Sequence, residues 1–219
     1  MEFTINRDVF LKSLSHAYGV IEKKNTLPIL SNVLIEAKNS KIKITATDLD
    51  LIYSEEIPIE KLVNEGTTTT SASILYDILR KIESGAKVEL SLQSANKLKL
   101  VSGKSKFNLL CISSDTFPLS DEDIQQKNFE VSSQALLKLL NKTKISISND
   151  ETRHYLNGIY MHKTNLNNKS FLTGVATDSH RLSSSSLEID PNISFESVIL
   201  PKKTIFQLVS LLEQGTSVI

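Results

Sequence analysis

FTINRDVFLKSL, residues 3–14, has a counterpart in FEVSSQALLKLL, residues 129–140, which lies 126 positions further along the chain. Each stretch opens with a phenylalanine in a short extended segment and continues with apolar residues at helical spacing. Self-similarity at a fixed long period is typical of a duplicated structural unit. This stretch therefore predicts that the chain contains two copies of one fold.

The same period continues through the rest of the chain. A four-residue slip, from an offset of 126 to one of 130, falls in KTNLNNKS (163–170), a polar segment that can take an insertion cheaply. The further matches are LSNVLIEA (30–37) with LNGIYMHK (156–163), TATDLD (45–50) with VATDSH (175–180), and TSASILYDILRKIESG (70–85) with LPKKTIFQLVSLLEQG (200–215).

Within the first copy a shorter cycle is visible, in which a strand is followed by a helix and then by three strands. Apolar residues at Val9, Phe10, Leu14 and Ala17 predict a helix from Arg7 to Ile21, and alternation in KIKITAT predicts a strand. Two such cycles make one domain of ordinary size. The expected strands are 3–5, 32–37, 41–46, 50–59, 67–71, 87–93, 96–103 and 104–112, and the second helix is 72–82.

The domain boundaries follow from this repeat. We expect a first domain at 1–120, a linker at 121–127 within the polar and acidic FPLSDEDIQQKN, and a second domain at 128–219. After Gly215 the second copy has only TSVI, so we expect a truncated domain with open sheet edges and apolar surface.

Composition excludes several classes of function. Acidic and basic residues balance at 25 each, and Cys111, the single cysteine, allows no internal disulfide. The four histidines lack zinc-site spacing, and a phosphate-binding glycine loop is absent, so neither a metal nor a cofactor is expected. Without a signal peptide or an apolar span, we expect a soluble cytoplasmic protein and no membrane partner.

Asp178, Ser179 and His180 suggest hydrolase chemistry at first sight. Catalytic groups usually converge from distant parts of a chain, and neighbours on a strand point to opposite faces. ATD also recurs at 46–48, where no chemistry need be invoked. We therefore favour a strand-to-turn element, with any special role in SHRL (179–182), and keep an enzyme that uses Asp178 and His180 as the rival hypothesis.

The four helical segments carry net charges of +2 (7–24), +1 (72–82), +3 (133–144) and +1 (201–213). Because the chain is neutral, strands and loops together hold −7. Lysines on a helix are often simply a solvated face, but a shared sign on all helices suits a phosphate backbone. A protein-interaction scaffold with no DNA role remains the alternative hypothesis.

LPILSN (27–32), TDLD (47–50), SGKSKFNL (102–109), RHYLNG (153–158) and ATDSHRL (176–182) resemble the bacterial DNA polymerase III beta subunit family, the sliding clamps. The resemblance covers the whole chain in order. It implies an α+β DNA-clamp fold, with duplicated strand–helix–three-strand units and helices on one face of antiparallel sheets. The family has three such domains, so this chain would hold the first, most of the second and none of the third.

The resemblance also implies a function without catalysis. Two subunits form a ring around duplex DNA and tether the replicative polymerase, which makes replication processive through weak, sequence-blind phosphate contacts. The residues matching the family's DNA contacts are Lys24, Ser73, Asp150, His154 and Tyr155. Ser73 and Asp150 depart from the family's arginine and glutamine and cannot attract phosphate as those do.

In the family, peptides from the polymerase III core, the clamp loader and repair polymerases dock in an apolar pocket. The matching residues are Leu156, Thr177, Ser179, His180, Arg181 and Leu182, and Ser179 replaces a glycine. The homodimer contact would fall on Lys104, Lys106, Phe107 and Leu109, on a strand that could equally be a charge-protected edge.

Overall fold

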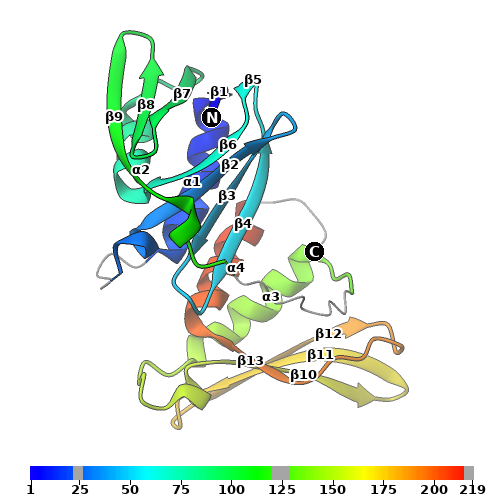
Figure 1. Ribbon diagram of the computed structural model, residues 1–219. Coiled ribbons are helices and arrows are strands. Elements are labelled where there is room, and N and C mark those ends of the chain that lie inside the picture. Colours follow the sequence, from blue (N-terminus) through cyan, green and yellow to red (C-terminus); the bar gives the residue numbers. More distant parts are fainter. Residues whose placement is uncertain (22–26, 120–128, 215–219) are drawn as a thin grey trace. The chain divides into compact units, whose positions relative to one another are not determined.

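A computed structural model describes residues 1–21, 27–119 and 129–214 of the chain (Figure 1). Contacts between Cα atoms divide the chain into two units, Met1–Asp121 and Glu122–Ile219. Each unit has its own buried apolar cluster, so each is described separately.

The first unit is a nine-stranded antiparallel sheet with two helices packed against it (Figure 1). The strand order is β4-β3-β2-β6-β9-β8-β7-β1-β5. The strands are β1 Glu2–Asn6, β2 Asn32–Lys38, β3 Lys41–Thr47, β4 Ile52–Pro58, β5 Lys61–Asn64, β6 Gly66–Ser71, β7 Lys87–Ser94, β8 Lys97–Ser102 and β9 Ser105–Ile112. The α-helices are α1 Arg7–Val20 and α2 Ala72–Lys81, and short 3₁₀ helices are η1 Pro28–Ser31 and η2 Ser114–Thr116.

Strand β9 joins the two halves of this sheet. Its residues Ser105–Leu110 pair with β8, and its last two residues pair with β6 at Thr69↔Ile112 and Thr70↔Cys111. Its first part, Ser105–Leu110, therefore has one edge that pairs with no other described strand. Cys111 lies buried near this junction, as a structural thiol should, and burial raises its pKa.

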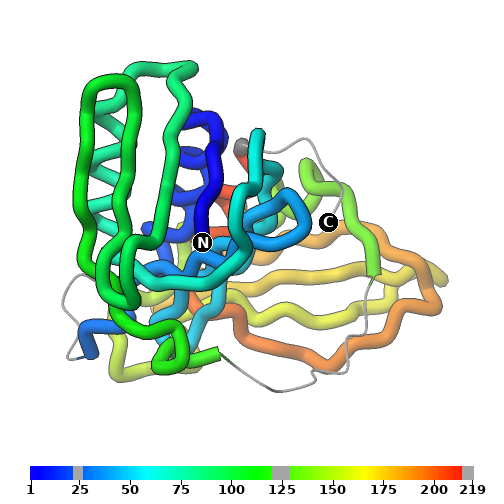
Figure 2. The backbone as a smooth tube through the Cα atoms, turned by 45° about the horizontal axis from the view of Figure 1, so that its top comes forward, coloured from blue at the N-terminus to red at the C-terminus, as the bar shows by residue number. Residues whose placement is uncertain are grey.

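The second unit is a four-stranded antiparallel sheet in the order β12-β11-β10-β13, with two helices against one face. The turned view in Figure 2 shows its strands in a single layer. The strands are β10 Gly158–Leu166, β11 Lys169–Thr177, β12 Leu182–Ile189 and β13 Val198–Pro201. The helices are α3 Ser133–Thr143, α4 Lys202–Gln214, η3 Lys144–Ser146 and η4 His154–Leu156.

The order of the second sheet repeats that of β4-β3-β2-β6 in the first, as the sequence repeat predicts. Asn6 and Ser132, which match in the repeat, both accept amide hydrogen bonds as N-caps of α1 and α3. At Gly174 of β11 a Cβ would lie 2.7 Å from Leu139, so glycine permits the close approach of α3. An α+β fold with helices on one face of antiparallel sheets is thus confirmed.

Two strand predictions need correction. Strand β5 (Lys61–Asn64) was not expected from the sequence; it pairs with β1. Residues 129–131, which match β1 in the repeat, form no strand because the described part of the second unit has no counterpart of β7 to pair with them. Phe129 instead stacks on Phe195 with ring centroids 5.5 Å apart.

The contact between the two helices is also repeated, with different chemistry. In the first unit Tyr18 stacks on Tyr76 at 5.0 Å between centroids, and α1 lies beside α2. The matching residues of the second unit are Lys144 and Phe206, and the Lys144 ammonium lies 5.7 Å from the centre of the Phe206 ring. Helix packing is therefore kept while an aromatic pair becomes a cation–π pair.

The edge strand β13 exposes apolar side chains. It pairs with β10 on one side, and among the described residues no strand pairs with its other side. Val198 and Ile199 on this strand are exposed. The matching strand of the first unit, β6, has β9 at that edge, so the second sheet has an open edge where the first does not.

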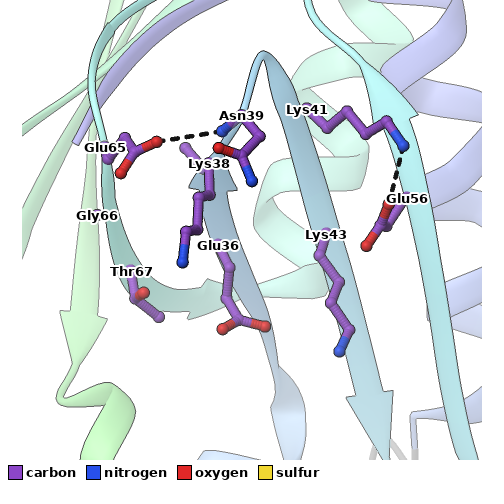
Figure 3. Close-up of a pocket in the computed structure, with 10 residues that line it drawn as sticks. Glu36, Lys38, Asn39, Lys41, Lys43, Glu56, Glu65, Gly66 and Thr67 are labelled. Atoms are coloured by element: carbon purple, nitrogen blue, oxygen red, sulfur yellow. Dashed lines mark hydrogen bonds and ion pairs between the residues drawn. The ribbon is translucent and has the colours of Figure 1, made fainter.

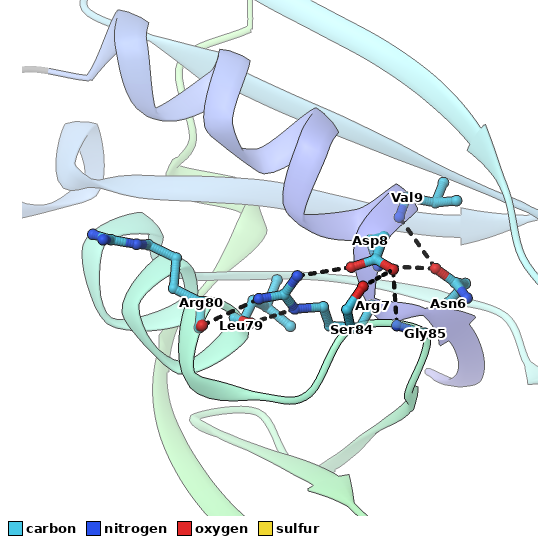
Figure 4. A network of polar contacts seen from close by, with 8 residues as sticks. All are labelled: Asn6, Arg7, Asp8, Val9, Leu79, Arg80, Ser84 and Gly85. Carbon is cyan, nitrogen blue, oxygen red and sulfur yellow. Dashed lines mark hydrogen bonds and ion pairs between the residues drawn. The ribbon is translucent and has the colours of Figure 1, made fainter.

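Arg7 fastens the start of α1 to the end of α2 (Figure 4). Its Nε donates to the Leu79 carbonyl at 2.6 Å and its Nη2 to the Arg80 carbonyl at 3.1 Å, which satisfies carbonyls of the last helical turn. Asp8 accepts from Arg7 Nη1, Ser84 Oγ and Gly85 N. These bonds hold the pKa of Asp8 below its ordinary value, the one from Arg7 most of all.

We expect Arg7→Ala to lower the free energy of unfolding of the first unit by about 1.5–3 kcal/mol, because hydrogen bonds to charged groups are worth that much. The Arg7 side chain is only 13% exposed, so water replaces it poorly. Urea unfolding measures the loss, and the pKa of Asp8 should rise. Lys12→Ala, an exposed change on the same helix, should stay within about 0.5 kcal/mol of the wild type. Equal stability of the two variants would contradict this role.

A half-buried carboxylate joins β4 to α1. Glu55 Oε2 accepts from Tyr53 Oη at 2.5 Å and lies 3.9 Å from His16 Nδ1. The interaction with His16 contributes most to lowering the pKa of Glu55 to about 2, while burial first and then Glu55 raise the pKa of Tyr53. The ionised form of Glu55 is therefore the one that the fold favours.

This pKa predicts a loss of stability in acid. Because the folded pKa lies below the ordinary 4.5, the contribution of Glu55 is complete above that pH and is lost as pH falls toward 2. The side chain is 37% exposed, so solvent screens part of the effect. Urea unfolding at several pH values from 5 to 2 measures how the free energy of unfolding falls with pH, and Glu55→Gln should make that fall smaller. Glu56→Gln, its exposed neighbour, should not; if both variants keep the wild-type slope, the interpretation fails.

Candidate functional site

The segment from Thr177 to Arg181 is a closed turn between β11 and β12. The Asp178 carboxylate accepts from the backbone amides of His180 and Arg181, both at 3.0 Å. The Thr177 hydroxyl accepts from the Ser179 amide and donates to the Arg181 carbonyl. The side chains of Thr177 and Asp178 thus close this turn, which we call the 177–181 turn.

The first unit has the same turn at 47–51. Asp48 Oδ1 accepts from the amides of Asp50 and Leu51, and Thr47 Oγ1 accepts from the Leu49 amide. The third residue has a positive φ in both turns, 84° at Leu49 and 80° at Ser179. The recurrence of Thr–Asp therefore has a structural cause, and the differences between the copies lie in the side chains that the turn presents.

The geometry gives little support to hydrolase chemistry. Both oxygens of Asp178 are engaged, since Oδ2 pairs with Arg181 Nε at 2.9 Å. The amides of His180 and Arg181, followed by the Arg181 side chain, hold the pKa of Asp178 below its ordinary value. Within the described residues no hydrogen bond joins this carboxylate to the exposed His180 ring, so the base and its orienting acid are not assembled.

A second closed segment, the 148–157 loop, precedes β10. Its ends are joined because the Ser148 amide donates to the Leu156 carbonyl at 3.0 Å. Asp150 turns the chain inside the loop by accepting from the amide and hydroxyl of Thr152. Helix α4 is tied to the loop through Lys202, whose Nζ donates to Asn149 Oδ1 at 2.6 Å. These bonds fix the backbone that carries His154 and Tyr155.

Arg153 connects the loop to the turn. Its Nε donates to Asp150 Oδ2 at 2.8 Å and its Nη1 to Ser179 Oγ at 3.0 Å. Thr152 and then Arg153 lower the pKa of Asp150. Arg153 was not predicted as a functional residue, although it lies in RHYLNG. Its bond to Ser179 spans 26 residues, and no local pattern indicates it.

The predicted peptide-pocket residues divide between the loop and the turn. His180, Arg181 and Leu182 are exposed, and Leu182 is 66% exposed. Leu156 is half-buried at the end of η4, and Thr177 supports the turn with its hydroxyl. The hydrogen bond from Arg153 to Ser179 joins the 148–157 loop to the 177–181 turn. Leu156 of the loop and the basic side chains of the turn therefore lie on adjacent segments. Their role as a pocket stays a prediction.

The predicted DNA-contact residues lie on helices and on the loop. His154 and Tyr155 are exposed on η4, and Tyr155 is 68% exposed. Ser73 is exposed in the first turn of α2, where its hydroxyl meets that of Ser71 at 3.1 Å. Asp150 is paired with Arg153 as described above, and Lys24 lies outside the described residues. Lys138 and Lys142 are exposed one helical turn apart on α3.

The predicted dimer-contact residues lie on and beside Ser105–Leu110, the part of β9 with one open edge. Lys104 and Lys106 are exposed, and Phe107 packs partly against the core. Leu109 is only 3% exposed and belongs to the core, so it offers almost no surface to a partner. Lys106 and Phe107 alternate between the two faces of the strand, as the pleat requires.

A hollow of about 570 Å³ lies on strands β2, β3, β4 and β6 of the first unit (Figure 3). Charged side chains of both signs line it, and they partly satisfy each other: Lys41 pairs with Glu56 at 3.2 Å, and Glu65 accepts from the Asn39 amide. None of the sequence-predicted site residues lines it. In the described part of the chain, no group of three or more metal-binding side chains comes together.

Two family models match the chain in order. The model described as DNA polymerase III beta subunit, N-terminal domain, matches residues 1–121, and the model for the central domain matches residues 130–219. The chain belongs to the DNA polymerase III beta subunit family. The DNA-clamp fold expected from the sequence is thus confirmed.

Individual members of the family agree with this assignment. The beta sliding clamp of Caulobacter vibrioides is 37% identical over 217 residues, covering 98% of this chain and 58% of that protein. That of Pseudomonas aeruginosa is 32% identical, covering 98% and 57%. A crystal structure of the Caulobacter crescentus clamp has a TM-score of 0.93 at 36% identity, covering 100% of this chain and 58% of that one.

A Bartonella birtlesii clamp structure bound to griselimycin has a TM-score of 0.91 at 40% identity, covering 98% of this chain and 57% of that one. The chain therefore spans about 58% of the length of the curated relatives it matches. No helix among the described residues is long and apolar enough to cross a membrane.

Proposed function

We propose that this chain supplies the DNA-facing helices and part of the partner-docking surface of a sliding clamp. The full-length protein would encircle duplex DNA and tether the replicative polymerase, without making or breaking a bond. The observation that carries the proposal is the match of both family domains, in order, to the two units of the chain. Cytoplasmic localisation is part of the proposal, because bacterial DNA lies in that compartment.

The attraction for DNA in the second unit comes from α3 in this proposal. Lys138 and Lys142 are exposed on one side of the helix, and the helix carries no acidic residue. Exposed lysines of this kind contact phosphate without reading sequence, as sliding requires. Asp150 is no obstacle to this role, because its charge is balanced by the guanidinium of Arg153.

Lys138→Gln with Lys142→Gln should weaken binding of the chain to a short duplex. Each lost phosphate contact should reduce the slope of log affinity against log salt by about 0.9. Fluorescence anisotropy across a salt series measures this slope.

The matched control is Lys41→Gln with Lys169→Gln, which removes the same charge from strands. If the α3 variant and the control lose the same affinity, non-specific charge explains the binding. A wild-type slope in the α3 variant would favour the protein-interaction scaffold instead.

Partner docking is proposed for the 177–181 turn and the residue after it. Leu182 offers an exposed apolar side chain, and His180 and Arg181 lie beside it in an ordered turn. Such a surface suits a short peptide with apolar anchors, since the stems of long side chains cover apolar groups. We propose the polymerase III core, the clamp loader and repair polymerases as the partners.

Replacing both His180 and Arg181 with alanine in a full-length clamp carrying this segment should lower the affinity for polymerase tail peptides at least about tenfold, because a few central residues carry most of the binding energy. Both side chains are exposed, so the fold should be retained. Calorimetry measures the affinity, and circular dichroism checks the fold. Wild-type peptide affinity in the double variant would remove the docking assignment.

The head-to-tail contact of a ring dimer is proposed for the open edge of β9. Ser105–Leu110 has an open edge, and Lys104, Lys106 and Phe107 are available beside it, whereas Leu109 would act from the core. An open edge with flanking lysines pairs only with a partner of matching shape and charge.

A further inference from the structure

Asp150 and Ser179 are two positions at which this chain departs from the residues expected for the family, and both bind one guanidinium. Asp150 Oδ2 accepts from Arg153 Nε at 2.8 Å, and Ser179 Oγ accepts from Arg153 Nη1 at 3.0 Å. A glycine at position 179 has no hydroxyl to offer. A glutamine at position 150 would bind Arg153 without the charge that strengthens the bond.

Each partner of Arg153 belongs to a segment that is closed on itself. The 148–157 loop is closed by the bond from Ser148 to Leu156, and the 177–181 turn by the bonds to Asp178 and Thr177. Neither set of bonds fixes one segment relative to the other. The guanidinium does, because its donors lie in a rigid plane and reach both acceptors at once.

We infer that Arg153 is a positioning residue that holds the 177–181 turn against the 148–157 loop, with Asp150 and Ser179 as its two anchors. Removing the charge of Asp150 in the loop should then weaken the hydrogen bonds of the 177–181 turn. This inference rests on the proposed function for the meaning of the two segments, as a peptide dock and a DNA-facing loop. The contact itself is testable without DNA or peptide.

Asp150→Asn and Ser179→Ala are the informative variants. Asparagine keeps the turn acceptor at position 150 but removes the charge. Alanine at position 179 removes the hydroxyl but keeps the Cβ. The conformational strain of a non-glycine residue at positive φ is therefore the same as in the wild type. The control is Glu151→Gln, which removes an exposed charge from the same loop. All are made in the 219-residue chain.

Two signals are measured by NMR at low salt. The Arg153 Nε–Hε resonance should shift and broaden in both variants and stay unchanged in the control. Amide exchange at His180 and Arg181 should rise about 2- to 10-fold in Asp150→Asn, the range expected for one hydrogen bond. Arg153→Lys should not restore wild-type exchange, because an ammonium lacks the planar fork that reaches both acceptors.

A coupling test decides whether Arg153 is the link. In an Arg153→Ala background, Asp150→Asn should no longer change exchange at the turn, since coupled residues act non-additively. An undiminished effect in that background overturns the inference, as does an unchanged Arg153 resonance in Ser179→Ala. If Arg153→Ala fails to fold, the Ser179→Ala resonance decides. Unchanged DNA binding in the Lys138/Lys142 variant, or unchanged peptide affinity in the His180/Arg181 variant, would overturn the proposed function alone.

Discussion

Burial of a helix pair against one face of an antiparallel sheet is the interaction on which both units depend. Leu14 of α1 and Leu140 of α3, which match in the repeat, are both fully buried, each over four strands in the same order. This packing leaves the other side of each helix to water and charge. It also places the strand-end turns outside the core, where side chains can change without loss of burial.

The turns at 47–51 and 177–181 show how side chains outside the core can differ between the two copies. The backbone hydrogen bonds of 47–51 and 177–181 are the same, and each turn accepts the cost of a non-glycine residue at positive φ. In the first turn, leucines and an aspartate follow Asp48. In the second, Ser179, His180 and Arg181 occupy those positions. Because Thr and Asp hold the backbone of the turn, the residues that follow Asp can change without a change in the backbone conformation.

The sequence predicted the regular elements within a few residues because periodicity reports burial, which is local in the repeat. It missed β5, since KLVN (61–64) is too short to show alternation and is held by its pairing with β1. It also implied a strand at 129–131 that lacks a partner. Strand formation depends on a neighbour distant in the chain, and a pattern within one segment cannot report that neighbour.

In the candidate site, too, the sequence does not show which distant residue balances a charge. Taken alone, Asp150 is an anion in a loop expected to face phosphate, and Ser179 is a poor substitute for glycine. The structure gives both residues one partner, Arg153, which balances the charge of the first and uses the hydroxyl of the second. Substitutions that look unfavourable one at a time can therefore be compatible as a set. Under the proposed function, the attraction of this unit for DNA then rests on the exposed lysines of α3, Lys138 and Lys142.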